Sequence, residues 1–516
     1  MHFAFKEIAT LPKLAWALQV RRGAAEVLVE HGPWVEVRER FFCEGAWNGD
    51  FTAQNIESSI LMGSGGKINE DGLLLACPSH TLDRIYLYRQ SDSLLASNSL
   101  PFILTKAGDD LDMRFLFYEG MLASVIDGID RYERVLPTRS GNGVHLRCYC
   151  NLLIDSELRV LEKAKAPIRD FAGFADYTSF LEDQIRGICD NANHLERKVS
   201  YSPVATISSG YDSPACAVLA RRIGCQTALT FAKAREAGEE DSGRLIGERL
   251  GLRVETFDRL AYRHKPNFPE AECFAGPTEF SCFDEELVRS VLFVGFYGDH
   301  VWDRNCQSVG RTMVREGAGG SDLTELRLRT GFILMPVASL GCTSHPSIHR
   351  ISNSIEMQPW TLGNGYDRPI PRRLVEECGI DRQLFGWRKR AAAVVVSEEG
   401  IQNTLSPKSF EDFSAFCDEF WNWQFAVKSS VVKLSRQLLH LNARVSRVLY
   451  RVVRRASGLE VKIPMVVPRS LRIRTYGYSG REALLFHWGI RKLMPRYGTG
   501  AGVADRSPHA EARYAA

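Results

Sequence analysis

The stretch from about residue 200 to 305 alternates strand-like and helix-like segments, and this alternation constrains the fold more than any other feature of the sequence. Short apolar runs are each followed by a segment with apolar residues at helical spacing. In chain order the predicted elements are strand 203–208, helix 213–224, strand 227–233, helix 239–252 and strand 253–259. Repeated strand–helix–strand units require a parallel sheet, so we predict an α/β fold with a doubly wound parallel sheet here.

The chain before residue 165 has a different pattern of short strands and polar turns. Residues 83–99 predict two strands joined by a polar turn, and residues 133–155 supply further strand and turn signals. Residues 113–126 predict an apolar helix between them, and an amphipathic helix is expected over 175–198. We therefore expect an N-terminal domain with antiparallel sheets over residues 1–165, a second domain over 170–400 and a basic helical region with a flexible tail over 401–516.

Composition narrows the class of protein. A chain of 516 residues is too long for one hydrophobic core, and 45% hydrophobic residues are ordinary for a soluble protein. The net charge of +3 gives no general argument for nucleic-acid binding. The 13 cysteines lack the dense, even spacing of a disulfide framework, and no signal peptide or membrane-spanning run is evident. These features predict a cytoplasmic protein without a transmembrane segment.

Metal-site spacings between cysteines are poor. Cys148 and Cys150 form the closest cysteine pair, and alternation around them predicts a strand that carries both side chains on one face. With no second cysteine or histidine pair at zinc-site spacing, the pair is expected to be structural.

The hexapeptide Ser-Ser-Gly-Tyr-Asp-Ser at 208–213 stands between the first predicted strand and the first predicted helix of the parallel sheet. Backbone N–H groups and the dipole of a helix start favour an anion, and the serine hydroxyls add donors. Asp212 would repel a phosphate unless a divalent cation lay between them. The turn thus predicts a site for Mg²⁺ and polyphosphate; on these residues alone, a side-chain cap of the helix is an equal alternative.

The hexapeptide resembles the Ser-Gly-Gly-x-Asp-Ser pyrophosphate loop of the ATP pyrophosphatases. Later stretches resemble, in order, the synthetase domain of the asparagine synthetase family, which includes β-lactam synthetases and lasso-peptide cyclases. These stretches are an acidic helix (239–252), a strand and its metal-binding loop (291–303), a segment that packs the synthetase core (353–380) and a lysine-bearing loop (384–392). Several matches in order are more specific than one hexapeptide.

This resemblance implies an Ntn-hydrolase-like N-terminal domain, an adenine nucleotide α-hydrolase-like synthetase domain with a helical C-terminal region, and ATP and Mg²⁺ as cofactors. It implies metal binding by Asp212 and Asp299 and catalysis by Lys389, which would steady the charge on phosphorus; a solvated basic loop is the alternative for Lys389. The nucleotide-binding residues that it implies are Ile207, Ser208, Ser209, Gly210, Asp212, Ser213, Phe231 and Gly295.

The sequence also departs from the family's pattern. Ser209 replaces a glycine, Phe296 replaces a glutamate, and His300 replaces an acidic residue. A glutaminase domain of this type needs Cys directly after the initiator Met, whereas here His2 follows Met1. We therefore expect a degenerate N-terminal domain that acts as a scaffold and does not hydrolyse glutamine.

The expected function is that of an AMP-forming carbon–nitrogen ligase, which adenylates a carboxylate and forms an amide or lactam bond. Its expected partners are a small-molecule or peptide carboxylate and an amine acceptor, with no nucleic acid. Two alternatives stay open: a catalytically degenerate binding or assembly protein, and a pyrophosphatase-loop enzyme that modifies a nucleobase or tRNA. The basic C-terminal helices predict a solvated face, a docking surface for a protein partner or a membrane-surface contact.

Overall fold

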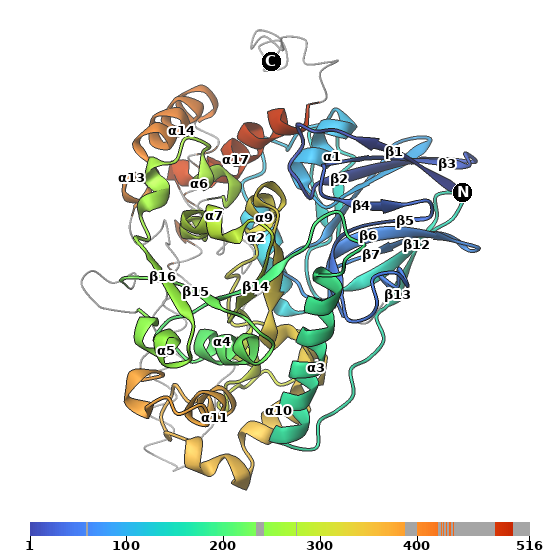
Figure 1. Ribbon diagram of the computed structural model, residues 1–516. Helices are drawn as coiled ribbons and strands as arrows, with labels where there is room; N and C mark the ends of the chain where they lie inside the picture. The colour runs from blue at the N-terminus through green and yellow to red at the C-terminus, as the bar shows by residue number, and fades with distance from the viewer. Residues whose placement is uncertain are drawn as a thin grey trace, which may run out of the picture.

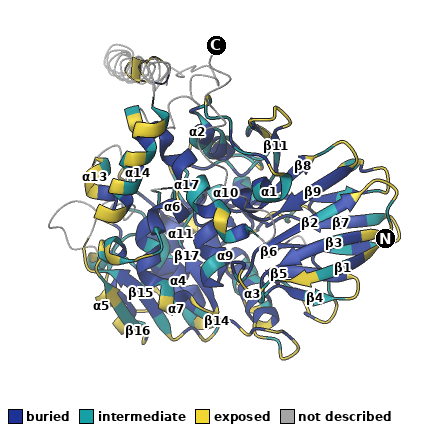
Figure 2. Ribbon diagram, turned by 90° about the horizontal axis from the view of Figure 1, so that it is seen from above, coloured by how far each residue is buried: buried dark blue, intermediate teal, exposed yellow. Residues whose placement is uncertain are grey.

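The structure is a computed structural model that describes residues 1–57, 60–233, 242–274, 276–387, 400–421 and 480–498, with isolated positions between 425 and 437. In this part of the chain three β-sheets form the framework, and helices surround the third sheet (Figure 1). Figure 2 shows that buried residues follow the sheets, whereas exposed residues gather on outer helices and loop tips. Among the described helices, none is long and apolar enough to cross a membrane.

The first N-terminal sheet holds seven described strands. Its neighbours pair antiparallel, except that β1 and β3 pair parallel. In spatial order the strands are β1 (His2–Glu7), β3 (Glu26–His31), β2 (Trp16–Arg21), β9 (Ser93–Ser97), β8 (Ile85–Arg89), β11 (Val144–Arg147) and β10 (Val135–Leu136). The two strands and the turn predicted over 83–99 are confirmed as β8 and β9.

The second sheet is antiparallel throughout its described strands. In spatial order they are β13 (Val160–Ala164), β12 (Cys150–Ile154), β7 (Gly72–Ala76), β6 (Leu61–Asn69), β5 (Phe41–Trp47) and β4 (Glu36–Arg38). Alternate apolar residues of both sheets meet in one buried core, where the Trp16 and Phe42 rings lie 5.0 Å apart. The expected antiparallel N-terminal domain is thus confirmed, apart from the parallel β1–β3 pair.

Two local predictions in this part are wrong. Cys148 and Cys150 do not share a strand, because the chain leaves the first sheet after β11 and enters the second at β12, with Tyr149 at φ +53° between them. The helix expected over 113–126 is only the short α2 (Tyr118–Ala123), followed by a 3₁₀ turn. In both places tertiary packing overrides a local pattern.

The third sheet is parallel, as predicted. All its described neighbours pair parallel, including β14 with β15 and with β17. In spatial order the strands are β16 (Arg253–Phe257), β15 (Thr227–Phe231), β14 (Ser202–Thr206), β17 (Ser290–Val294) and β18 (Ile333–Pro336). The chain therefore winds outward from β14 in one direction and then from β17 in the other. A doubly wound sheet has this strand order, and its direction switches between β14 and β17.

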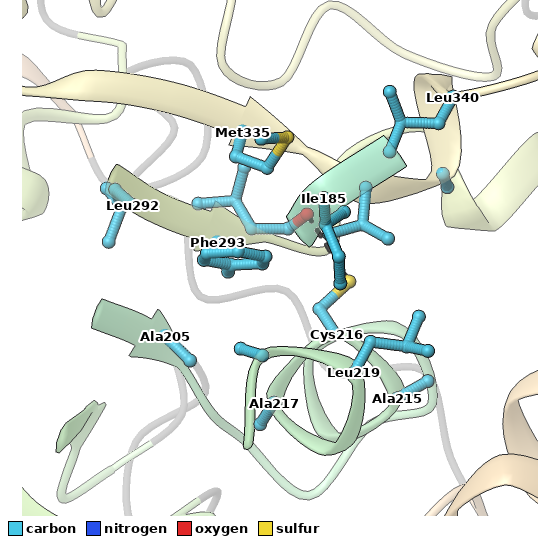
Figure 3. Packing of buried hydrophobic residues seen from close by; sticks show 14 of the residues in the cluster. Ile185, Ala205, Ala215, Cys216, Ala217, Leu219, Leu292, Phe293, Met335 and Leu340 are labelled. Atoms are coloured by element: carbon cyan, nitrogen blue, oxygen red, sulfur yellow. Dashed lines mark hydrogen bonds between the residues drawn. The ribbon is translucent and has the colours of Figure 1, made fainter. Parts of the chain in front are cut away.

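Small residues let α4 (Asp212–Arg222) lie close to the middle of the parallel sheet. Cys216 and Ala217 are fully buried, and the Cys216 thiol donates a hydrogen bond to the carbonyl of Val294 over 3.5 Å. Figure 3 shows Cys216 between α4 and the side chains of Phe293 and Ile185. This close packing fixes the start of α4 against the ends of β14 and β17. Other helices among the described residues of this half include α3 (Phe174–Ala192), α5 (Arg244–Arg249), α7 (Asp284–Leu287), α8 (Gly298–Val301), α9 (Thr324–Thr330), α10 (His345–Ser352) and α11 (Pro369–Glu376).

A C-terminal helix joins the two halves of the molecule. α17 (Leu485–Leu493) packs against α6 (Pro269–Glu272) and α1 (Leu100–Ala107), and Phe486 stacks on Tyr118 with ring centroids 5.6 Å apart. Before it, α13 (Ile401–Thr404) and α14 (Pro407–Phe420) lie on the outer side of α6 and α17 (Figure 1). The basic helical stretch expected over 426–457 falls largely, and the tail after residue 498 entirely, outside the described residues.

Candidate functional site

A cavity of about 510 Å³ opens at the carboxyl ends of β14, β15 and β17. Residues directly after each of these three strands line it. In doubly wound sheets, ligands bind outside the carboxyl ends of the strands, at the point where the winding direction switches. The cavity lies at this point, and its volume falls within the range of roughly 300–1,000 Å³ that is usual for small-molecule sites.

The turn between β14 and α4 forms the floor of the cavity. The hydroxyls of Ser208 and Ser213 are 2.8 Å apart, and the Ser208 hydroxyl accepts a hydrogen bond from the Gly210 N–H over 3.3 Å. Of the predicted site residues, those that line the cavity are Ile207, Ser208, Gly210, Asp212, Ser213, Phe231, Gly295 and Asp299.

Two predicted residues are not placed at the cavity. Ser209 does not line it; the Ser209 carbonyl accepts a hydrogen bond from the Gly386 N–H over 2.9 Å. This contact ties the turn to the segment after α11. Lys389, predicted as the catalytic lysine, lies outside the described residues.

Two glycines bring the loop after β17 against the start of α4. A Cβ atom on Gly298 would lie 2.5 Å from Cγ of Asp212, and one on Gly295 would lie 2.8 Å from Cβ of Asp212. Such distances are shorter than real Cβ contacts, so any larger residue would push the two loops apart. The glycines therefore hold Asp212 of α4 and Asp299 of α8 at one cavity.

Asp212 forms a buried ion pair with Arg368. The Arg368 side chain is 5% exposed and that of Asp212 is 17% exposed. Burial by itself would lower the pKa of Arg368, but the charge of Asp212, with smaller contributions from Tyr366 and Asp299, raises it overall. Tyr211 stands at the N-cap of α4 without a side-chain cap, and Asp212 is the first helical residue. The alternative that Asp212 caps α4 is therefore wrong.

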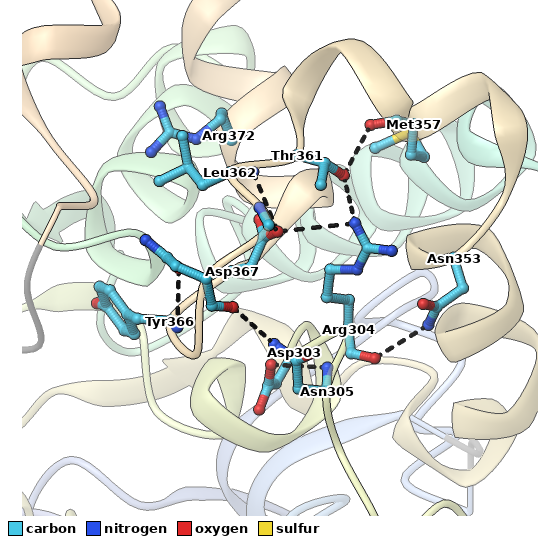
Figure 4. A network of polar contacts seen from close by, with 12 residues as sticks. Asp303, Arg304, Asn305, Asn353, Met357, Thr361, Leu362, Tyr366, Asp367 and Arg372 are labelled. Atoms are coloured by element: carbon cyan, nitrogen blue, oxygen red, sulfur yellow. Dashed lines mark hydrogen bonds and ion pairs between the residues drawn. The ribbon is translucent and has the colours of Figure 1, made fainter. Parts of the chain in front are cut away.

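A polar network holds the segment that carries Arg368. The Asp367 carboxylate accepts hydrogen bonds from the N–H groups of Leu362 and Gly363, and Arg304 lies 3.7 Å from it (Figure 4). The Arg304 N–H also donates to the Asp367 carbonyl over 3.2 Å. Because Asp367 is fully buried and charged, this network fixes the backbone next to Arg368.

Aromatic rings form one wall of the cavity. Phe231, at the end of β15, stacks on Phe283 with ring centroids 4.6 Å apart. Phe296 packs against Phe280, with the two ring centroids 5.9 Å apart. The rings give the cavity a flat apolar surface beside its charged floor, which suits a planar base or another apolar group.

The loop between β17 and α8 contains a strained residue that the N-terminal half holds in place. Tyr297 has φ +75°, a left-handed conformation that is costly for a non-glycine residue. Its hydroxyl lies 2.6 Å from both the N–H and the hydroxyl of Thr81, and the Arg315 guanidinium lies 4.7 Å above its ring. The N-terminal sheets thus help to shape the cavity.

Sequence reasoning missed several ionisable residues of the cavity. Arg368 lies in a segment interpreted as packing, and Arg315 and Asp322 lie in a loop without a periodic pattern. Burial raises the pKa of Asp322 to about 6, although the charges of Arg84 and Arg315 oppose the shift. The sequence signal that could have pointed to these cavity residues is the number of arginines in the two segments.

His2 and Cys43 are the residues of the N-terminal half that bear on glutamine hydrolysis. His2 opens β1, and Cys43, the nearest cysteine in sequence, is fully buried in β5. Burial raises the pKa of the Cys43 thiol far above its ordinary value. A buried and protonated thiol is inert.

No protein-family model matches this sequence, and no curated protein matches it either.

Proposed function

We propose that this protein is an ATP-dependent carbon–nitrogen ligase, which adenylates a substrate carboxylate and joins it to an amine with release of AMP and pyrophosphate. The observation that carries the proposal is the cavity at the switch point, which gathers the 208–213 turn, Asp212 and Asp299. The sequence resembles the asparagine synthetase family at these same residues. The proposal includes the finer fold assignment, an Ntn-hydrolase-like N-terminal domain followed by an adenine nucleotide α-hydrolase-like domain.

In this proposal each wall of the cavity has a separate role toward ATP. The adenine lies against the aromatic wall at Phe231, and the hydroxyls of Ser208 and Ser213 and the N–H groups at the start of α4 bind the phosphates. Arg368 adds a fixed positive charge on the same floor. The protein accelerates the reaction mainly by positioning the carboxylate against the α-phosphate and by stabilising the developing charge.

The donor set of the cavity fits Mg²⁺. Asp212 and Asp299 supply carboxylate oxygens, the ligands that this hard cation prefers, and both line the cavity that would hold the phosphates. Bound there, Mg²⁺ would neutralise pyrophosphate as a leaving group. Without the ion, the Arg368 guanidinium offsets one of the two carboxylate charges, that of Asp212, with which it pairs.

The acceptor amine belongs to the substrate in this proposal. The chain has no cysteine at residue 2 that would generate ammonia from glutamine. Phe280 and Phe296 make the side of the cavity beyond the phosphates apolar, which favours a carboxylate substrate with a sizeable apolar part. Amide or lactam formation between two groups of one peptide or small molecule meets both conditions.

The test is titration of MgATP into the full-length protein by calorimetry, together with pyrophosphate release in the presence of candidate carboxylates. We expect Asp212→Asn and Asp299→Asn to weaken Mg²⁺-dependent ATP binding and to lower pyrophosphate release together. Asp303→Asn is the matched control, because Asp303 lies on the same loop as Asp299 but outside the cavity lining. Unchanged affinity in both cavity variants rejects the proposal.

A binding or assembly role is the second candidate function. The ion pair between Arg368 and Asp212, together with Phe296 in place of a glutamate, would fit a protein that binds a nucleotide without using it. The same assay separates the two functions, since tight MgATP binding without pyrophosphate release for any candidate carboxylate favours the binding role.

A further inference from the structure

Three side chains that commonly ligate metals meet behind the wall of the cavity. His300 lies in α8, Cys306 in the loop that follows, and His345 at the start of α10. Their exposures are only 2%, 7% and 2%, and their ligand atoms all lie within 4.8 Å of one another. The three residues come from separate elements and span 46 positions of the sequence, so no local pattern brings them together.

The distances at His300 agree with those between ligands of one zinc ion. Zn–S bonds of about 2.3 Å and Zn–N bonds of about 2.0 Å, at a tetrahedral angle, place sulfur and nitrogen about 3.5 Å apart. The Cys306 Sγ atom lies 3.5 Å from His300 Nδ1 and 3.8 Å from His300 Nε2, so its separation from Nδ1 fits two ligands of one zinc ion once the His300 ring turns to point a nitrogen at the ion. The same nitrogen is 3.4 Å from a carboxylate oxygen of Glu316, long for a hydrogen bond but close to the separation of nitrogen and oxygen ligands.

His345 points to the same conclusion independently. Its Nε2 atom is buried and has no hydrogen-bond partner among the described residues. Its ring centroid lies 4.8 Å from that of His300. A buried polar atom without a partner costs free energy, and coordination of a metal would remove that cost.

We propose that His300, Cys306 and His345 bind a structural zinc ion, and that the exposed Glu316 side chain, which contacts His300, turns toward the ion as the fourth ligand. Two imidazoles, a thiolate and a carboxylate form a tetrahedral donor set of net charge −2, which balances Zn²⁺ and is softer than the oxygen set that Mg²⁺ prefers. Zinc binding displaces the thiol proton of Cys306 to solvent. The Glu316 side chain is 55% exposed and gives the ion a path from solvent.

The ion would brace the wall of the cavity. Glu316 stands between Arg315 and Gly317, which both line the cavity, and His300 directly follows Asp299. Zinc bound to Glu316, His300 and His345 therefore ties this irregular loop and α8 to α10. The site is separate from the carboxylates proposed for Mg²⁺ and stands whether or not the protein is a ligase.

The first experiment uses the full-length wild type. Chelator-treated protein is titrated with Co²⁺, which reports tetrahedral coordination and thiolate ligation by absorption, and the bound Co²⁺ is then displaced with Zn²⁺. We expect one equivalent of Co²⁺, a thiolate-to-cobalt charge-transfer band and loss of the spectrum on addition of one equivalent of Zn²⁺. A wild-type spectrum without the thiolate band, or no bound Co²⁺, overturns the proposal without recourse to any variant.

Variants then assign the ligands. Cys306→Ser should abolish the charge-transfer band, and His345→Gln should weaken Zn²⁺ binding by more than about 100-fold, since the loss of an outer-shell partner alone costs 10–100-fold. The matched controls are Cys378→Ser, at an exposed cysteine, and His349→Gln, one turn further along α10. Loss of the band in Cys378→Ser, or its persistence in Cys306→Ser, refutes the assignment.

Discussion

The ion pair between Arg368 and Asp212 gives the sharpest test of the charge balance in the cavity. Arg368→Gln removes the guanidinium that pairs with Asp212, and leaves the carboxylates of Asp212 and Asp299 at one partly buried site without this cation. Repulsion between like charges in such a site destabilises the folded protein. A divalent cation would relieve that repulsion. We therefore expect the variant to be less stable than the wild type and more strongly stabilised by Mg²⁺ alone.

The burial of the pair sets the size of the effect. Exposed ion pairs contribute about 0–1 kcal/mol, whereas breaking a buried pair costs about 3–5 kcal/mol. With Arg368 5% exposed and Asp212 17% exposed, the pair belongs near the lower end of the buried range. A loss of about 3 kcal/mol corresponds to a fall in Tm of about 6–12 °C for a domain of roughly 200 residues. Mg²⁺ at ten times its Kd would restore about 1.4 kcal/mol.

Thermal unfolding in the absence and presence of Mg²⁺, followed by tryptophan fluorescence, measures both effects. Arg329→Gln is the matched control, because Arg329 pairs with the buried Glu272 and with Asp284 and does not line the cavity. It should lower the Tm without changing the response to Mg²⁺. An Arg368→Gln variant with the Tm and the Mg²⁺ response of the wild type would contradict the prediction, because it would show that the guanidinium does not affect the charge of the two carboxylates.

Three further predictions concern the cavity and the N-terminal half. Phe231→Ala should weaken MgATP binding by about tenfold in calorimetry, because it removes about 1.4 kcal/mol of ring contact with the base; unchanged affinity would place the adenine elsewhere. The pKa of Asp322 is raised from 3.8 to about 6, so the folded protein holds this proton more tightly and loses stability as pH rises through that interval. Asp322→Asn should remove that loss, and its stability relative to the wild type in urea unfolding should rise by about 2 kcal/mol between pH 4 and pH 7; a difference independent of pH contradicts this. The protein should release no glutamate from glutamine, with or without ATP, because His2 stands where the nucleophile is required.

The parallel sheet could be predicted from sequence because its information is local. The strands β14, β15 and β16 are short runs separated by segments of helical periodicity, whereas β17 was expected from the family resemblance and β18 was not predicted. The α4 boundaries agree with the prediction within two residues, and the turn at 208–213 contains the serines and the glycine that the site uses. The strand order and the N-terminal pairing contain no such local signal, so the parallel β1–β3 pair was not foreseen.

The cavity was only half predictable, since local sequence identifies donors but not their partners. Asp212 was found in the turn at 208–213 and Asp299 through the family resemblance; both lie in the helices that follow β14 and β17. Arg368 lies 156 residues from Asp212, and Thr81 lies 216 residues from the Tyr297 hydroxyl that it holds. Partners so distant come together only through the packing of α11 and of the N-terminal sheets, which no spacing rule encodes.

These distant partners change what a predicted residue means. From the sequence alone, Asp212 at a helix start favours a helix cap and a metal ligand equally. In the structure Tyr211 is the N-cap residue, and Asp212 pairs with Arg368, so the charge of the whole cavity becomes the quantity to test. His300 alone is a departure from a family pattern, but beside Cys306 and His345 it becomes part of a donor set. In both cases the chemical group is the same as in the sequence, but the residues packed around it determine what it can bind. The stabilisation by Mg²⁺ in thermal unfolding therefore tests the site at Asp212, and the absorption spectrum of bound Co²⁺ independently tests the site at Cys306.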